Sequence, residues 1–339
     1  GAPQRVGERP IARSGKACEI LRVDCHGTIE TLTHEYVSRK DDCIDRAVRE
    51  CAMRYAFHIL DVFTDRPFGG NQLAVLPDAA GLGDARMQQV AAEFGFSETT
   101  FVLPPTRPGH DCRVRIFTPR FEMPFAGHPT IGTAIALAGL GRAPGGRVVM
   151  EQIAGTVPVD ILAGSPVEAE LTAPEPPALR DAPELAACAA LVGLGIDDVA
   201  TARIASAGAP FLFVELRSLG ALGRARVPAP GQIAEANGLA LFTRETGSPE
   251  HDLRMRMFAP DHGIAEDPAT GSAAAALGGL LATTEGGADG WRSWRIGQGI
   301  EMGRPSLLRV RARREAGKVA EIRVAGAAVT VAEGTIEVP

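Results

Sequence analysis

The chain has 339 residues, of which 45% are hydrophobic and 22% are charged, and its formal net charge is −6. These values predict a soluble globular protein of two domains, and the lack of a basic cluster with interleaved aromatic residues argues against nucleic-acid binding. No apolar run is long enough to span a bilayer and no secretory segment is present, so we expect no membrane association and a cytoplasmic location.

Residues 1–53 differ from the rest of the chain because they are polar, show weak periodicity and contain four of the six cysteines. The cysteine spacings lack the close CxxC pairs that are typical of zinc sites, so no metal site is predicted there. Met53 leads directly into a strand-like run, which suggests that 1–53 is an N-terminal extension, disordered or non-native. Residues 42–51 could form a short helix.

Regular patterns begin at Tyr55. Alternating large apolar residues predict a strand at 57–63, and a second strand at 73–76 follows a glycine-rich turn. A helix is predicted from Asp84, as its N-cap, to about Phe94, with Gly95 ending it. Its buried face would carry Met87, Val90, Ala91 and Phe94. A strand at 99–103 then places Glu98 at the strand's entry.

The later segments continue this mixture of strands and helices. The patterns predict strands at 112–117, 148–153, 157–162, 167–171, 200–206, 210–216, 239–244 and 254–258, helices at 185–194 and 233–237, and a closing meander of strands at 307–313, 319–324, 328–331 and 335–338. The proline-rich segment 172–183 is the predicted linker.

One short motif occurs twice. Residues 128–134 have the sequence HPTIGTA and residues 267–273 have DPATGSA, so that His128 and Asp267 open the two copies. The upstream segments VRIFTP and MRMFAP also match, and each copy continues into a buried helix, at 134–140 and 273–281. Each copy is therefore interpreted as a strand, a loop, a glycine and a helix start. Because helix N-termini present free N–H groups and a partial positive charge, the repeat predicts a pseudo-twofold protein with an anionic ligand between its halves. The alternative is a shared way of starting a packed helix.

Four motifs carry a resemblance to a known family: SETTF at 97–101, GHPTIG at 127–132, EDPATGSA at 266–273, and residues 298–306. With them the chain resembles the PhzF family of phenazine-biosynthesis-like isomerases, from Tyr55 to the C-terminus. The resemblance implies an α+β fold of two pseudo-symmetric domains, each a β-barrel-like sheet around a central helix (diaminopimelate epimerase-like). The implied domains are 54–180 plus 327–339, and 181–326. It also implies an active site in the cleft between the domains, and a homodimer.

The same resemblance implies the roles of individual residues. Glu98 matches the catalytic glutamate that moves a proton within one small carboxylate substrate, and a pKa raised by burial would suit this task. His128 and Asp267 would hold polar groups of the substrate or assist the proton transfer. The predicted substrate-binding residues are Asn71, Ser97, Gly127, Gly132, Gly271 and Ser272. The helix starts carry Gly132-Thr133 and Gly271-Ser272 instead of cysteine, so a thiolate pair is not expected. No cofactor or metal is predicted.

Alternatives remain open at this point. Glu98 could be a solvated residue at a strand edge, His128 a hydrogen-bonded structural residue, and Asp267 a helix N-cap. Glu301 and Arg304 are expected to pair and order the loop 298–306. For the whole protein, the alternatives to a proton-shifting isomerase are an epimerase or racemase without the cysteine pair, and a non-catalytic small-molecule binding protein.

Overall fold

The computed structural model describes residues 18–23, 29–34, 53–233 and 235–339. The chain forms two compact units. In the unit of residues 1–53, β1 (Cys18–Val23) pairs antiparallel with β2 (Ile29–His34). The helix predicted at 42–51 lies outside the described residues, as do most of the early cysteines. In the described part of the chain, none of the helices has the length and apolar character needed to cross a membrane.

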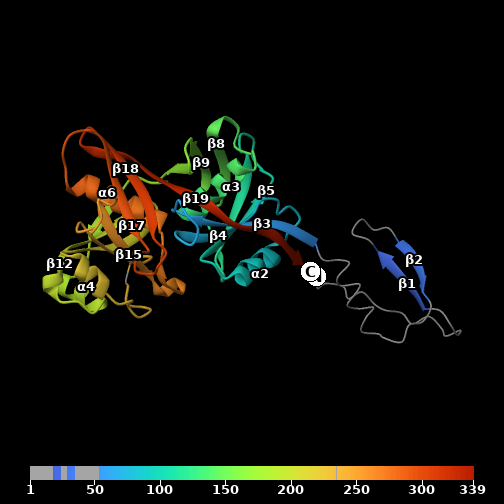
Figure 1. The fold of residues 1–339 in the computed structure, drawn as a ribbon, viewed down its shortest axis with the longest axis horizontal. Helices are drawn as coiled ribbons and strands as arrows, with labels where there is room; N and C mark the ends of the chain where they lie inside the picture. Colours follow the sequence, from blue (N-terminus) through green and yellow to red (C-terminus); the bar gives the residue numbers. More distant parts are fainter. Residues whose placement is uncertain (1–17, 24–28, 35–52, 234) are drawn as a thin grey trace, which may run out of the picture. The chain divides into compact units, whose positions relative to one another are not determined.

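The second unit, Arg54–Val338, has two halves with the same plan. The first half surrounds a buried helix, α3 (Figure 1). Its elements are β3 (Met53–Val62), β4 (Asn71–Leu76), α2 (Asp84–Phe94), β5 (Glu98–Leu103), β6 (Cys112–Phe117), β7 (Glu122–Met123), α3 (Gly127–Gly139), β8 (Arg147–Gln152), β9 (Gly155–Leu162) and β10 (Glu168–Thr172). In this half β4 pairs parallel with β5, β5 antiparallel with β6, and β6 parallel with β8.

The second half repeats this pairing around α6. Its elements are β11 (Ala178–Asp181), α4 (Leu185–Leu191), β12 (Val199–Ser206), β13 (Pro210–Leu216), α5 (Leu219–Arg224), β14 (Leu239–Thr243), β15 (Leu253–Ala259), β16 (Ile264–Asp267), α6 (Gly271–Thr284), β17 (Gly290–Gln298), β18 (Ser306–Glu315) and β19 (Lys318–Val338). Here β13 pairs parallel with β14, β14 antiparallel with β15, and β15 parallel with β17. The predicted α+β fold of two barrel-like sheets, each around one helix, is therefore confirmed.

Each half also contains an equivalent, partly buried ion pair. The guanidinium of Arg115 binds both carboxylate oxygens of Glu122, at 2.6 and 2.5 Å, and lies 5.0 Å from the ring of Phe117. In the second half Arg256 binds both oxygens of Glu266 at 2.8 Å and lies 5.0 Å from the ring of Phe258. Bidentate ion pairs of this kind fix geometry as well as adding stability. In each half this contact holds the hairpin that leads to the central helix.

The last strand joins the halves, and here the prediction of three short strands was wrong. β19 is continuous over 21 residues, pairing first with β18 and then with β10. Gly326 lies between two of the predicted strands, but it forms no turn and the chain stays extended there. Instead it makes room for a side chain, since a Cβ at Gly326 would lie 2.2 Å from the ring of Phe63.

Several other expectations were corrected. The N-cap of α2 is Gly83, while Asp84 is the first helical residue and bonds to Arg115. No helix is found at 233 or 235–237 in the described chain, and α5 was not predicted. The predicted linker contains β11, which pairs with β12. The domain boundaries themselves stay a prediction.

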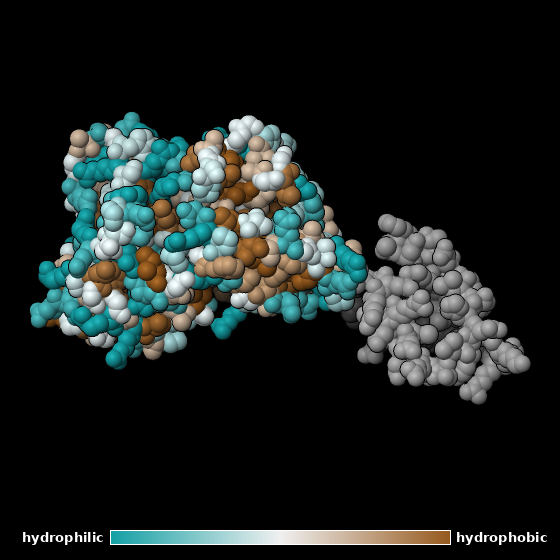
Figure 2. Space-filling view, in the orientation of Figure 1, coloured by the Kyte–Doolittle hydropathy of each residue, from teal (hydrophilic) through white to brown (hydrophobic). Residues whose placement is uncertain are grey.

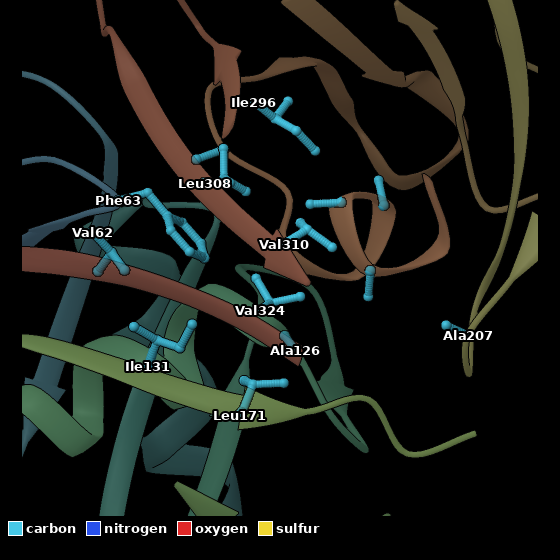
Figure 3. Close-up of a cluster of buried hydrophobic side chains, with 14 of the residues drawn as sticks. Val62, Phe63, Ala126, Ile131, Leu171, Ala207, Ile296, Leu308, Val310 and Val324 are labelled. Atoms are coloured by element: carbon cyan, nitrogen blue, oxygen red, sulfur yellow. The ribbon is translucent and has the colours of Figure 1, made fainter. Parts of the chain in front are cut away.

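The largest apolar core runs through both halves. Figure 3 shows Phe63, which directly follows β3, among side chains that come from both halves. Its backbone bonds to Ala327 on β19 and to Leu307 on β18, and its φ of +67° turns the chain there. On the face seen in Figure 2, hydrophilic residues cover much of the β12–β18 half, and apolar residues are more frequent over the β3–β9 half.

Candidate active site

The central helices of the two halves meet at their N-termini. A Cβ on Gly127, the first residue of α3, would lie 3.2 Å from the Cα of Gly271, the first residue of α6. Neither N-cap side chain, Ala126 or Thr270, caps its helix. The first N–H groups of both helices therefore remain for a ligand, and both dipoles favour a negative charge at this point.

Three ionisable side chains surround this junction, and all three are buried. Glu98 is the first residue of β5, His128 the second residue of α3, and Asp267 the last residue of β16. Burial excludes the solvated strand-edge alternative for Glu98. Asp267 is not the N-cap of α6, because Thr270 holds that position; instead Thr270 Oγ1 donates a 2.5 Å hydrogen bond to Asp267 Oδ2.

Asn71 links the two halves of the site. Its Nδ2 lies 2.9 Å from Asp267 Oδ1, 3.1 Å from the carbonyl of Ala269 and 3.4 Å from His128 Nδ1. Ser97 Oγ in turn donates to Asn71 Oδ1 at 3.4 Å. The amide thus orients both the imidazole and the carboxylate of the repeated motif.

The free ends of Glu98 and His128 point to the same place. Glu98 Oε2 lies 3.5 Å from His128 Nε2, and both atoms are buried without a hydrogen-bond partner among the described residues. Buried polar atoms normally have partners, and exceptions are frequent where a ligand binds. Both residues line the cavity described below.

Burial separates the protonation states of these groups. It raises the pKa of Glu98 to about 8, with the nearby Asp267 adding to the rise. It lowers the pKa of His128 to about 3, although a hydrogen bond to the Gln72 backbone acts in the opposite direction. It raises the pKa of Asp267 to about 6, against the bonds from Thr270 and Asn71. Although Glu98 and His128 are within ion-pair distance, both are mainly neutral at pH 7, and Asp267 carries the charge.

The site opens into a cavity of about 420 Å³ between the halves. Its polar end is formed by Glu98, His128, Asp267 and the helix starts at Gly127, Gly271 and Ser272. Its other walls are mainly apolar and include Phe121, Met123, Phe125, Leu171, Phe211, Met257 and Val324. Such a combination of apolar walls and a few converging polar groups is typical of a small-molecule site.

The predicted residues divide into two groups. Glu98, Gly127, His128, Asp267, Gly271 and Ser272 line the cavity, whereas Asn71 and Ser97 support it from behind. Gly132 is not brought to the cavity. It lies further along α3, where a Cβ would be 2.6 Å from Leu73 and 2.7 Å from Val62, so its lack of a side chain serves packing against β3 and β4.

The sequence did not single out two supporting residues. Thr270 holds Asp267 as described above. Gln298 Nε2 donates to the carbonyl of Asp267 at 2.7 Å, and its Oε1 accepts from the Thr270 backbone at 3.1 Å. Gln298 is the first residue of segment 298–306, one of the four segments that carry the family resemblance, and this match is the sequence feature that could have indicated its role.

The expected pair of Glu301 and Arg304 does not form. Glu301 accepts from Arg254 at 2.6 Å. Arg304 Nε donates to the carbonyl of Gly70 at 2.8 Å, and its terminal nitrogen bonds to Asp61 and to the carbonyl of Gly69. Arg304 therefore ties the loop to the turn that carries Asn71, which places it in the support of the site.

The described residues contain no group of three or more His, Cys, Asp or Glu side chains placed to hold a metal ion.

A family model described as phenazine biosynthesis-like protein (PhzC-PhzF) matches residues 60–334. The chain belongs to this family. The predicted PhzF resemblance is thus confirmed over most of the second unit.

Among curated relatives of this PhzF-family chain, an uncharacterized isomerase of Mesorhizobium japonicum is 41% identical over 296 residues, covering 82% of this chain and 97% of that protein. The trans-2,3-dihydro-3-hydroxyanthranilate isomerase of Pseudomonas fluorescens is 39% identical over 283 residues, covering 82% and 98%. Relatives named as isomerases support an isomerase here.

Among solved structures, a PhzF-family phenazine biosynthesis protein of Bacillus anthracis matches with a TM-score of 0.78 at 28% identity, covering 84% of this chain and 99% of that one. A probable proline racemase of Agrobacterium radiobacter matches with a TM-score of 0.55 at 14% identity, covering 83% and 92%, which shows a shared fold.

Proposed function

We propose that this PhzF-family chain is an isomerase that moves a proton from one carbon of a small carboxylate substrate to another, with Glu98 as the acid and base. The observation that carries the proposal is the pair of unpartnered atoms, Glu98 Oε2 and His128 Nε2, which meet at 3.5 Å in the cavity beside two helix N-termini.

The reaction is balanced within one molecule. The Glu98 carboxylate takes a proton from a carbon next to a conjugated system, and the electron pair left behind is delocalised over that system and the substrate carboxylate. The protonated Glu98 then returns the proton to a different carbon, and the double bonds shift. The substrate keeps its composition, so no oxidant or reductant is consumed.

The surroundings of Glu98 suit both steps. The pKa of about 8 lies near neutral pH, where a single group can accept and donate protons at comparable rates. The N–H groups of the two helix starts stabilise the negative charge that develops on the substrate carboxylate. Neutral His128, oriented by Asn71, and ionised Asp267 hold polar substituents next to Glu98.

The epimerase alternative would need a second base, and cysteine does not provide it. In the described chain, Cys112 and Cys188 are buried and do not line the cavity between the halves. Burial raises the pKa of the Cys112 thiol to about 12, which removes thiolate character.

The test is turnover in deuterated water followed by NMR. Wild type and Glu98→Gln are incubated with a panel of conjugated carboxylates that includes trans-2,3-dihydro-3-hydroxyanthranilate, the substrate named for several relatives. Wild type is expected to shift a double bond, with partial deuterium incorporation at the new C–H position. Glu98→Gln is expected to lose at least 1,000-fold in rate, because a general acid–base residue and a proton carrier are lost together.

The outcomes separate the candidate functions. Turnover by Glu98→Gln at the wild-type rate contradicts the role of Glu98. Exchange with inversion of a stereocentre and no shifted double bond indicates an epimerase. Binding of carboxylates without exchange indicates a non-catalytic binding protein. The homodimer and the cytoplasmic location also stay predictions, and light scattering of the purified chain tests the first.

A further inference from the structure

The pairing of strands lets the two halves be compared residue by residue around the cavity. Phe117 and Phe258 are equivalent, since each follows the paired arginine by two residues and packs against it. Phe117 lies opposite Thr99 on β5, and Phe258 lies opposite Leu239 on β14. The residue before Thr99 is Glu98, and the residue before Leu239 is Gly238. The second half therefore has glycine where the first half has its acid.

Gly238 also lacks room for a side chain. A Cβ there would lie 2.8 Å from the carbonyl oxygen of Phe258, within backbone that cannot move aside. The second half is thus closed to a catalytic side chain at this position.

The neighbouring strands extend the comparison to Asn71. Leu73 on β4 pairs with Glu98, and the register of β13 with β14 places Phe211 beside Gly238. Counting back two residues on each strand, Asn71 corresponds to Ala209. Ala209 and Phe211 both line the cavity, whereas neither Asn71 nor Leu73 does. At the positions equivalent to Asn71 and Leu73, the second half therefore presents an apolar wall to the cavity.

The rest of that wall is built from small or apolar side chains. It continues through Ala207 and Ala275 of the second half, and Leu171 and Val324 line the same cavity. In Figure 3, Ala126, Leu171 and Val324 lie close together, and Ala207 lies apart from them. The exposed polar residues Glu175, Asn237 and His262 lie on the lining, where solvent reaches it.

We infer that this wall is an apolar subsite, so that the preferred substrate is a carboxylate with an apolar arm extending from its reacting end toward Ala207 and Ala209. The inference rests on the proposed function for the position of the carboxylate. A compact single-ring carboxylate reaches the helix N-termini and Glu98 but leaves much of the 420 Å³ unfilled. An arm against the alanines would add buried apolar area, which is the main source of affinity in such sites.

The test measures binding by calorimetry with two probes, benzoate and 4-butylbenzoate. Burial of each added methylene group is expected to tighten binding roughly three- to fourfold. Wild type is therefore expected to bind 4-butylbenzoate at least tenfold more tightly than benzoate. Ala209→Leu fills the subsite and is expected to reduce this ratio below threefold, with the dissociation constant of benzoate changed less than threefold.

Two further variants make the result specific. Ala207→Leu fills the same subsite from another backbone position, and it replaces Ala209→Leu should that variant fail to fold by circular dichroism. Ala92→Leu makes the same change on the exposed side of α2 and is expected to keep the wild-type ratio. A wild-type ratio below twofold, the absence of binding by both probes, or an equal loss for both probes in the filled variants overturns the inference.

Failure of the subsite and failure of the proposed function give different results. Selective binding of the armed probe, with no deuterium exchange on any carboxylate, retains the subsite and rejects the isomerase. Exchange that depends on Glu98, with no preference for the armed probe, retains the isomerase and rejects the subsite.

Discussion

Replacing Glu98 by glutamine should change the pH dependence of folding stability in a defined way. The pKa of Glu98 rises from 4.5 to about 8 on folding, mainly because the side chain is buried. Between these pH values the unfolded chain releases this proton and the folded chain keeps it, so wild type loses stability as the pH rises from 4.5 to 8. Below 4.5 both states hold the proton, and above 8 both have released it.

The magnitude follows from the shift. At about 1.4 kcal/mol for each pKa unit, the rise corresponds to about 5 kcal/mol, an upper value because the ionised site can admit water. We expect the free energy of unfolding of Glu98→Gln, relative to wild type, to increase by about 2–5 kcal/mol between pH 4.5 and pH 9.

The assay is urea unfolding across this pH range, followed by the fluorescence of Trp291 and Trp294. Glu93→Gln makes the same chemical change on the exposed side of α2 and measures the effect of surface charge alone. A stability difference for Glu98→Gln that is the same at every pH would refute the raised pKa, and with it the argument that burial prepares Glu98 for proton transfer.

Three other predictions follow from the site and the core. With Glu98 acting first as a base, kcat/KM should rise about tenfold per pH unit from pH 6, where Asp267 ionises, up to pH 8, and then level off. A profile that falls over this range would mean that Glu98 must start protonated. Asn71→Ala should lower kcat about 10- to 100-fold with a smaller effect on stability, because Asp267 and His128 lose a shared partner; steady-state kinetics with thermal unfolding would show it. Gly326→Ala should destabilise the chain by about 2–4 kcal/mol, since its Cβ would overlap the ring of Phe63. The control Gly139→Ala, whose Cβ meets nothing within 4 Å, should be neutral or stabilising, and equal effects of the two variants in urea unfolding would contradict this packing.

Local patterns were enough for many elements. Met87, Val90 and Ala91 form the buried face of α2 as predicted, whereas Phe94, predicted with them, is half-buried. Gly95 ends the helix in the left-handed conformation. The long strand β19 was harder to predict, because it changes partner without bending and so leaves no turn residue. Turn signals mark the ends of hairpins, but they carry no information on which strand lies alongside.

The supporting residues of the site needed the structure because their contacts are distant in sequence. Asn71 meets Asp267 across 196 residues, and Arg304 meets Asp61 across 243. Glu301 and Arg304 are close in sequence and of opposite charge, yet each has a better partner elsewhere. Sequence proximity favours a contact only where no folded neighbour offers a more buried one.

The repeated motif was a correct sign of duplication, but its two copies do not begin their helices at the same point. α3 starts at Gly127, ten residues after Phe117, whereas α6 starts at Gly271, thirteen residues after the equivalent Phe258. His128 therefore lies inside its helix, while Asp267 ends the strand before its own. From these unequal positions, both side chains contact the amide of Asn71. A duplicated scaffold thus supplies two helix N-termini suited to an anion. The unequal connections place Glu98, His128 and Asp267 in different surroundings within one site.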